Sequence, residues 1–143
     1  MGLDALENEI RDCGLFRSKA KNIMAACQKL CDESHGEVPQ TIEELMKLPG
    51  VGRKTANVVV SIIFDIPAIA VDTHVFRVSN RLKLAVGDTP LAVEQGLMKA
   101  IPKEKWSAAH HWLIWHGRLV CKARKPVCKE CPLKELCPSF ELA

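Results

Sequence analysis

The 143-residue sequence lacks three features that would place it in other classes of protein. It has no run of 18 apolar residues, so no segment reads as a transmembrane helix. Its N-terminus lacks the basic stretch followed by an apolar stretch that marks a secretory signal peptide. It also lacks a large excess of charge, because 20 Lys and Arg against 17 Asp and Glu leave a net charge of +3. This net charge is too small to predict nucleic-acid binding by itself. Because the sequence has neither a transmembrane segment nor a signal peptide, we expect a cytoplasmic protein.

The composition is that of a globular chain with enough apolar residues for a core. Hydrophobic residues make up 48% of the sequence and charged residues 26%, and the length is compatible with one domain or two small ones. There are seven cysteines. Because nothing indicates export, the sequence favours free thiols or metal ligands over disulfides.

The chain is organised around residues 48–56, which read Leu-Pro-Gly-Val-Gly-Arg-Lys-Thr-Ala. Upstream, Thr41 and Glu44 have the spacing of a capping box, which predicts a short helix. Pro49 cannot continue that helix, and the glycines permit a tight turn. A second helix is expected from Arg53 to Phe64, because this stretch is apolar and has no breaker.

The sequence thus predicts a helix, a glycine turn and a helix over about residues 41–64. The first N–H groups of the second helix have no partner within the helix and lie at its positive end, which suits a phosphate. The alternative is a hairpin that turns sharply for packing alone. The residues expected to approach a nucleic-acid backbone are Gly50, Val51, Gly52 and Arg53.

Lys54 falls in the first turn of the second helix. A lysine attacks as the neutral amine, and the positive end of a helix disfavours the ammonium form, so the position suits a nucleophile. The alternative is a solvated surface lysine or a phosphate contact.

Asp72 precedes a helical pattern that runs from Thr73 to Leu82 and is expected to be its N-cap. The connection after the Lys54 helix is long enough to lead back towards Lys54. A lysine that attacks and a carboxylate that holds or moves a proton would form a pair suited to chemistry at an electrophilic sugar carbon.

Four further helical patterns are present, and two of them begin at recognisable caps. Ser18 is expected to cap a helix that ends near His35, and Thr89 with Pro90 is expected to start another. Leu15 lies at a turn, where it is either a hydrophobic staple or an exposed wedge that separates bases. These helices are predicted at residues 4–12, 18–35, 89–101 and 107–120.

Four cysteines near the C-terminus have the spacing of a metal site, Cys121-x6-Cys128-x2-Cys131-x5-Cys137. Zinc sites use paired short knuckles, whereas only the middle pair here is short. Closely strung cysteines with neighbouring prolines favour an iron–sulfur cluster, and zinc remains the alternative. Between the first two ligands lies a basic run that is either a solvated face or a phosphate contact, and it contains Lys122, Arg124 and Lys125.

Taken together, these motifs closely resemble the endonuclease III family. The resemblance is carried by residues 48–56, Val71-Asp72-Thr73-His74, residues 111–118 and the four-cysteine tail. It implies an all-α helix-hairpin-helix DNA glycosylase fold with a C-terminal [4Fe-4S] loop at residues 121–137. It also implies a base excision repair enzyme that removes oxidised pyrimidines from double-stranded DNA and cleaves the strand 3′ to the abasic site by β-elimination.

The resemblance further implies roles for individual residues. Lys54 matches the Schiff-base nucleophile and Asp72 the catalytic carboxylate, while Leu15 and His74 match positions that enter or line the gap left by a flipped nucleotide. The cluster ligands would be Cys121, Cys128, Cys131 and Cys137.

The resemblance also sets expectations for the whole chain. It predicts a partial helical domain at residues 1–66, a cluster domain at residues 67–143 and, for a complete protein, a monomer associated with the nucleoid. Because family members begin with further helices, we expect this chain to be a fragment. The alternatives are a DNA-binding module without catalysis, or an adenine or mismatch glycosylase, which lacks a lysine at the position of Lys54.

Overall fold

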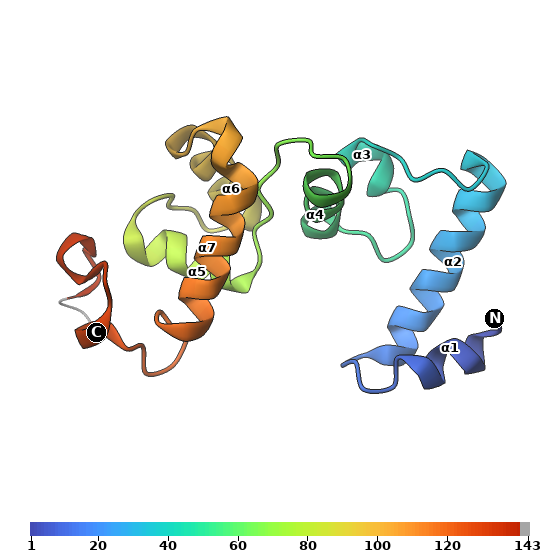
Figure 1. The fold of residues 1–143 in the computed structure, drawn as a ribbon, viewed down its shortest axis with the longest axis horizontal. Helices are drawn as coiled ribbons and strands as arrows, with labels where there is room; N and C mark the ends of the chain where they lie inside the picture. Colours follow the sequence, from blue (N-terminus) through green and yellow to red (C-terminus); the bar gives the residue numbers. More distant parts are fainter. Residues whose placement is uncertain (141–143) are drawn as a thin grey trace. The chain divides into compact units, whose positions relative to one another are not determined.

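A computed structural model describes residues 1–140, and these residues form helices without any strand (Figure 1). The predicted all-α fold is therefore confirmed. The α-helices are α1 Leu3–Glu9, α2 Phe16–Ser34, α3 Ile42–Leu45, α4 Arg53–Ile63, α5 Thr73–Leu82, α6 Pro90–Ala100 and α7 Trp106–Leu119. The 3-10 turns are η1 Lys103–Lys105, η2 Cys128–Glu130 and η3 Lys134–Leu136. Among the described residues, no helix is long and apolar enough to cross a membrane.

The chain divides into two compact units, Met1–Ala56 and Asn57–Ala143. The division lies inside α4, whereas the sequence placed the boundary after this helix. The assignment of domains to residues 1–66 and 67–143 stays a prediction.

Three helix starts follow the expected capping chemistry. The Thr41 hydroxyl oxygen accepts a hydrogen bond from the Glu44 N–H at 3.3 Å, and the Thr89 hydroxyl oxygen accepts one from the Ala92 N–H at 3.2 Å. Asp72 caps α5 in the same way. Side chains that accept from the first turn replace partners that the helix itself cannot supply. These caps were predicted from the sequence and are confirmed.

The prediction that Ser18 caps α2 was wrong. The helix begins at Phe16, and its N-cap is Leu15, which has a left-handed backbone with φ 59° and makes no side-chain cap hydrogen bond. The Lys19 N–H already donates to the Leu15 carbonyl at 3.0 Å. The left-handed residue turns the chain directly into the helix, so Ser18 falls within the first turn.

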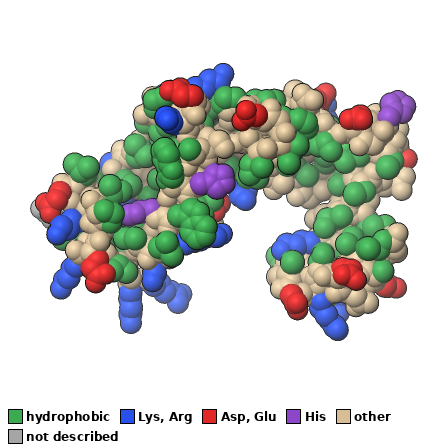
Figure 2. Space-filling model, in the orientation of Figure 1, with side chains coloured by type: hydrophobic (Ala, Val, Ile, Leu, Met, Phe, Trp, Pro, Cys, Tyr) green, Lys and Arg blue, Asp and Glu red, His purple; other side chains and the backbone are tan. Residues whose placement is uncertain are grey.

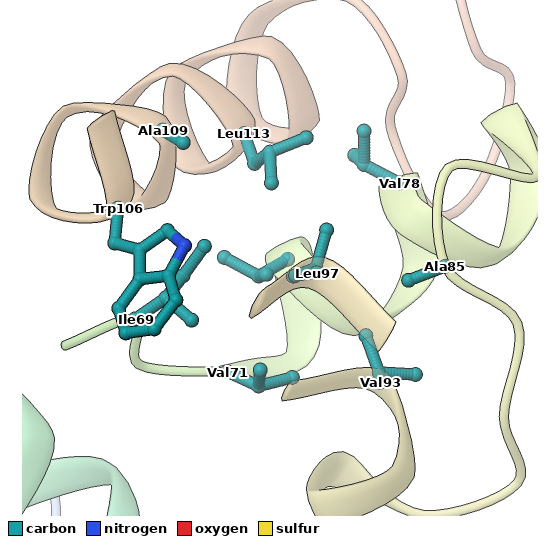
Figure 3. Close-up of a cluster of buried hydrophobic side chains, with 10 residues drawn as sticks. Ile69, Val71, Val78, Ala85, Val93, Leu97, Trp106, Ala109 and Leu113 are labelled. Carbon is teal, nitrogen blue, oxygen red and sulfur yellow. The ribbon is translucent and has the colours of Figure 1, made fainter. Parts of the chain in front are cut away.

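The second unit has the larger core, formed where α5 packs against α6 and α7 (Figure 3). The extended segment before α5 runs into this core, with Ile69 and Val71 both buried. Trp106 closes one side of the core, and its indole N–H donates to the Ile101 carbonyl at 2.9 Å. The remaining members of the cluster are Val75, Val78, Ala85, Val93, Leu97, Ala109 and Leu113.

Polar and apolar surface are distributed unevenly over the second unit. Trp112, Trp115 and Leu119 leave more than half of their surface exposed along α7. Lys and Arg side chains project from the end of this unit that carries the C-terminal segment (Figure 2).

Candidate functional site

The turn between α3 and α4 uses its two glycines differently. Gly50 has φ 76°, and the Val51 N–H donates to the Leu48 carbonyl at 3.1 Å. A Cβ on Gly50 would lie 2.6 Å from the Cβ of Asn22, whereas a Cβ on Gly52 would meet no atom within 4 Å. Gly50 is thus needed for packing. Gly52 leaves an open backbone at the start of α4, where a phosphate can approach N–H groups.

Lys54 is the second residue of α4 and is exposed. It lies two residues after the open backbone of Gly52, at the positive end of the helix. Its amine is therefore accessible to a DNA strand that binds at the turn. Lys54 and Asp72 belong to different compact units, and their expected approach stays a prediction.

Asp72 is held in place by the hydrogen bonds of its own side chain and by two buried valines nearby in the sequence. Its Oδ1 accepts hydrogen bonds from the N–H groups of His74 and Val75, both at 2.8 Å. Val71 and Val75 on either side are buried, which holds the half-buried carboxylate at the start of α5. Because both bonds end on Oδ1, the cap does not use Oδ2, and that oxygen is suited to contact a proton of a bound substrate.

The segment before Asp72 is tied to α7 by a buried histidine. His110 Nδ1 lies 2.7 Å from the Ala70 carbonyl oxygen. A carbonyl oxygen only accepts, so Nδ1 carries the proton and donates. This bond anchors the chain two residues before Asp72.

Leu15 differs from the staple that the sequence allowed. A staple leucine packs against its own helix, but Leu15 is 82% exposed and has a left-handed backbone. The side chain stands at the N-terminal end of α2 as an apolar projection, which is the geometry of the wedge alternative.

The four C-terminal cysteines come together around one cavity. All four are free and half-buried, and all line one small cavity with a volume of about 30 Å³. In residues 1–140 no group of three or more His, Cys, Asp or Glu is arranged to hold a single metal ion. The four thiols that line one cavity are the donor set with which a protein can hold an iron–sulfur cluster. The other residues around it are Leu82, His116, Val120, Lys134 and Phe140.

His116 is the one imidazole in that lining. Its Nε2 lies 3.8 Å from Cys131 Sγ, and desolvation by burial lowers its pKa. Burial thus favours the neutral form of the ring.

Arg81 of α5 binds the backbone of the basic run at residues 122–125. The guanidinium donates to the Lys122 carbonyl at 2.7 Å and to the Ala123 carbonyl at 3.2 Å. These contacts fix the backbone of the loop, while Lys122, Arg124 and Lys125 stay exposed. Three cations on a fixed loop form a surface that is suited to phosphates.

Sequence reasoning missed Arg77 and Arg81, which connect α5 to the cysteine loop. Arg77 Nε donates to the Cys121 carbonyl at 3.1 Å, and Arg81 lies 3.5 Å from Cys121 Sγ. The one available signal was their spacing of four residues on an amphipathic helix, which places both on one face. The partners are backbone carbonyls about 40 residues away, and no sequence pattern identifies them.

Two family models match the chain. The model described as HhH-GPD superfamily base excision DNA repair protein matches residues 1–103, and the iron-sulfur binding domain of endonuclease III matches residues 121–137. The second match confirms the expectation of an iron–sulfur site in preference to zinc, at the residues that contain the four cysteines.

Individual relatives agree with these matches. Endonuclease III of Rickettsia conorii is 55% identical over 140 residues, which are 98% of this chain and 67% of that protein. Endonuclease III of Bacillus subtilis is 55% identical over 136 residues, which are 94% of this chain and 62% of that protein. The chain thus spans about two thirds of the length of these relatives.

A solved structure shows the same fold. It is described as a trapped endonuclease III-DNA covalent intermediate in an estranged-adenine complex. It matches with a TM-score of 0.92 and 56% identity, over 99% of this chain and 67% of that one. From its sequence, its fold and its cysteine cavity, the chain belongs to the endonuclease III family of the HhH-GPD superfamily.

Proposed function

We propose that the chain is the catalytic part of a base excision repair enzyme, a DNA glycosylase with abasic-site lyase activity. Its substrate would be double-stranded DNA that contains an oxidised pyrimidine or an abasic site. The observation that carries this proposal is Lys54, an exposed amine beside an open glycine backbone at a helix N-terminus. A relative described as a trapped covalent intermediate with DNA supports the proposal, because such an intermediate needs a nucleophile on the protein.

In the proposed reaction, the neutral amine of Lys54 attacks C1′ of the damaged nucleotide. The new C1′–N bond replaces the bond to the base, which leaves with its electron pair and takes up a proton. The nitrogen then loses a proton, and its electron pair opens the C1′–O4′ bond while O4′ takes up a proton, which gives an open-chain iminium. This iminium is an electron sink. Loss of a proton from C2′ then expels the 3′ phosphate and cleaves the strand, and water releases the sugar from Lys54.

Asp72 would supply the carboxylate for these proton transfers. Its cap bonds hold Oδ1 rigidly, and a fixed group loses little entropy when it enters the reaction. Oδ2 is the oxygen that would receive or return a proton, or stabilise the positive charge that develops on the sugar.

DNA would be held by three surfaces that read no sequence. The turn at Gly50, Val51, Gly52 and Arg53 would bind one phosphate through backbone groups. The loop with Lys122, Arg124 and Lys125 would bind another region of the backbone. A reacting sugar inside the stack is inaccessible, so the nucleotide has to be flipped out, and the exposed Leu15 would enter the gap with His74 lining it.

The ligands of a [4Fe-4S] cluster would be Cys121, Cys128, Cys131 and Cys137, which line a single cavity. The bound cluster would cross-link the C-terminal segment through four Fe–S bonds and has no role in the proposed reaction. Arg81 would then transmit the position of this segment to α5 and present the basic loop to DNA. For the intact protein, we propose a monomer that works in the cytoplasm on nucleoid DNA.

A duplex with one thymine glycol and labels at both ends of the damaged strand tests this function. The proposal predicts release of the damaged base and a cut on the 3′ side of the lesion, with no cut in the matched undamaged duplex. Binding to both duplexes without any base release would support a non-catalytic DNA-binding module instead.

A further inference from the structure

Arg77 makes an unusually complete set of contacts beside the candidate site. Its Nη2 donates to the Gly117 carbonyl at 2.8 Å, and its Nη1 lies 3.4 Å from the Thr73 carbonyl. Its Nε donates to the Cys121 carbonyl, and Nη2 also lies 3.2 Å from His74 Nδ1. Four of the five N–H donors of the guanidinium are thereby directed at acceptors.

Packing makes this arrangement specific. A Cβ on Gly117 would lie 3.0 Å from the His74 Cβ and 3.3 Å from Arg77 Nη2. The glycine therefore lets α7 approach α5 closely enough for its carbonyl to reach the guanidinium. Gly117 is buried, so this contact lies within the packed interface of the two helices.

The contact between Arg77 and His74 determines the tautomer of the histidine. A guanidinium carries its charge at any physiological pH and only donates. His74 Nδ1 must therefore be the acceptor, and the single ring proton must be on Nε2. Arg77 thereby fixes both the orientation of the ring and the identity of its remaining polar atom, which is a donor.

We propose that Arg77 is a positioning residue that holds His74 as the Nε2–H tautomer, so that the first turn of α5 presents a hydrogen-bond donor to an oxygen of the DNA strand. This inference rests on the proposed function, because it concerns the same DNA-binding site. The turn that presents this donor also carries the Asp72 carboxylate, since Asp72 Oδ1 accepts from the His74 N–H. The first turn of α5 thus presents a fixed donor, His74 Nε2–H, beside a fixed acceptor, the Asp72 carboxylate.

The tautomer can be measured without DNA. In protein with 15N-labelled histidine, two-bond 1H–15N correlations distinguish Nδ1–H from Nε2–H, and loss of one signal set in His74→Gln assigns the residue. The expected result is the Nε2–H pattern for His74 in the unmodified chain and a mixture of tautomers in Arg77→Met. A Nδ1–H pattern or a mixture in the unmodified chain would overturn the proposal, even if the variant does not fold.

Arg81→Met is the matched control. Arg81 also connects α5 to the cysteine loop, and its guanidinium is directed at Cys121, Lys122 and Ala123 rather than at the His74 ring. Its loss should leave the His74 tautomer unchanged. If Arg81→Met alters the tautomer as much as Arg77→Met does, the effect arises from loosening of the loop, and the proposed role of Arg77 is wrong.

Affinity for a duplex with a tetrahydrofuran abasic analogue supplies the second readout. Loss of one positioned hydrogen bond predicts a roughly tenfold weaker affinity in His74→Leu, and a smaller loss in Arg77→Met, where part of the histidine keeps the Nε2–H donor. Because Arg77 acts through His74, the double variant should be no weaker than His74→Leu. Additive losses would contradict the proposal. Absence of lyase activity with the expected tautomer would contradict the proposed function alone.

Discussion

The backbone of Gly50 lies against Asn22 of α2 so closely that any side chain at Gly50 would overlap it. A Cβ at this position would stand 2.6 Å from the Asn22 Cβ, a separation that side chains do not adopt without a shift. Both residues belong to the first compact unit. The contact therefore fixes the position of the turn before α4 relative to α2, the helix whose N-cap is Leu15.

Gly50→Ala should destabilise the protein by about 1 to 3 kcal/mol, since it overpacks this contact. The positive φ of Gly50 adds to the cost, because an alanine resists that conformation. Urea denaturation followed by circular dichroism measures the loss. Unchanged stability would show that α2 and the turn separate easily and that the contact is not structural.

Gly52→Ala is the matched variant at the other glycine. Its Cβ would meet nothing within 4 Å, so we expect a change in stability within about 0.5 kcal/mol. The added methyl group stands where a phosphate would approach the backbone, so affinity for duplex DNA should fall several-fold. Equal DNA affinity in Gly52→Ala and the unmodified chain would remove this backbone from the proposed binding surface.

Asp72→Asn should separate the catalytic role of the side chain from its capping role. Asparagine accepts the same N–H bonds, so we expect little loss of stability, whereas Asp72→Ala should cost about 1 kcal/mol. Without the carboxylate, single-turnover base release should slow about 100-fold or more. If Asp72→Asn retains full activity, Asp72 serves only as the N-cap of α5 and has no catalytic role.

Cys128→Ser should prevent assembly of the iron–sulfur cluster, because Cys128 is one of four thiols around the cavity. We expect loss of the yellow-brown colour and of bound iron and sulfide, together with increased proteolysis of the C-terminal segment. Cys13→Ser is the control, since Cys13 is exposed and far along the chain from the cavity. A colourless unmodified chain that contains one zinc would refute the cluster.

Two tryptophans of α7 should differ sharply in their contribution to stability. Trp106 is buried in the core and Trp112 is 60% exposed. Trp106→Ala should cost about 3 to 5 kcal/mol, whereas Trp112→Ala should change the free energy of unfolding by about 0.5 kcal/mol or less. Equal losses in thermal or urea unfolding would mean that the exposed face of α7 is covered in solution.

The features that could be predicted from the sequence are local ones. Thr41, Asp72 and Thr89 cap the helices that follow them, because a cap and its N–H partners lie within three residues. The gathering of Cys121, Cys128, Cys131 and Cys137 around one cavity was also predictable, since these four residues lie within one short segment. In each case the residue types and their spacing contain the whole interaction.

The features that could not be predicted depend on backbone conformation or on distant carbonyl groups. The start of α2 is determined by the left-handed Leu15, which no residue preference indicates. Arg77 and Arg81 bind the carbonyls of Gly117, Cys121 and Lys122, and every residue type has such a carbonyl. Only the fold brings these acceptors to α5. The hydrogen bonds by which Arg77 orients His74 and Arg81 holds the basic loop could therefore not be predicted from the sequence.

Covalent trapping on abasic-site DNA is the measurement that tests the central claim most directly. Borohydride reduces an imine between Lys54 and C1′ to a stable amine, so the unmodified chain should form a protein–DNA adduct whose modified peptide contains Lys54. Lys54→Gln should form none, while its affinity for the uncleaved duplex should stay within about threefold, because phosphates are bound by other groups. An adduct of equal yield in Lys54→Gln, or no adduct with the unmodified chain, would contradict the account.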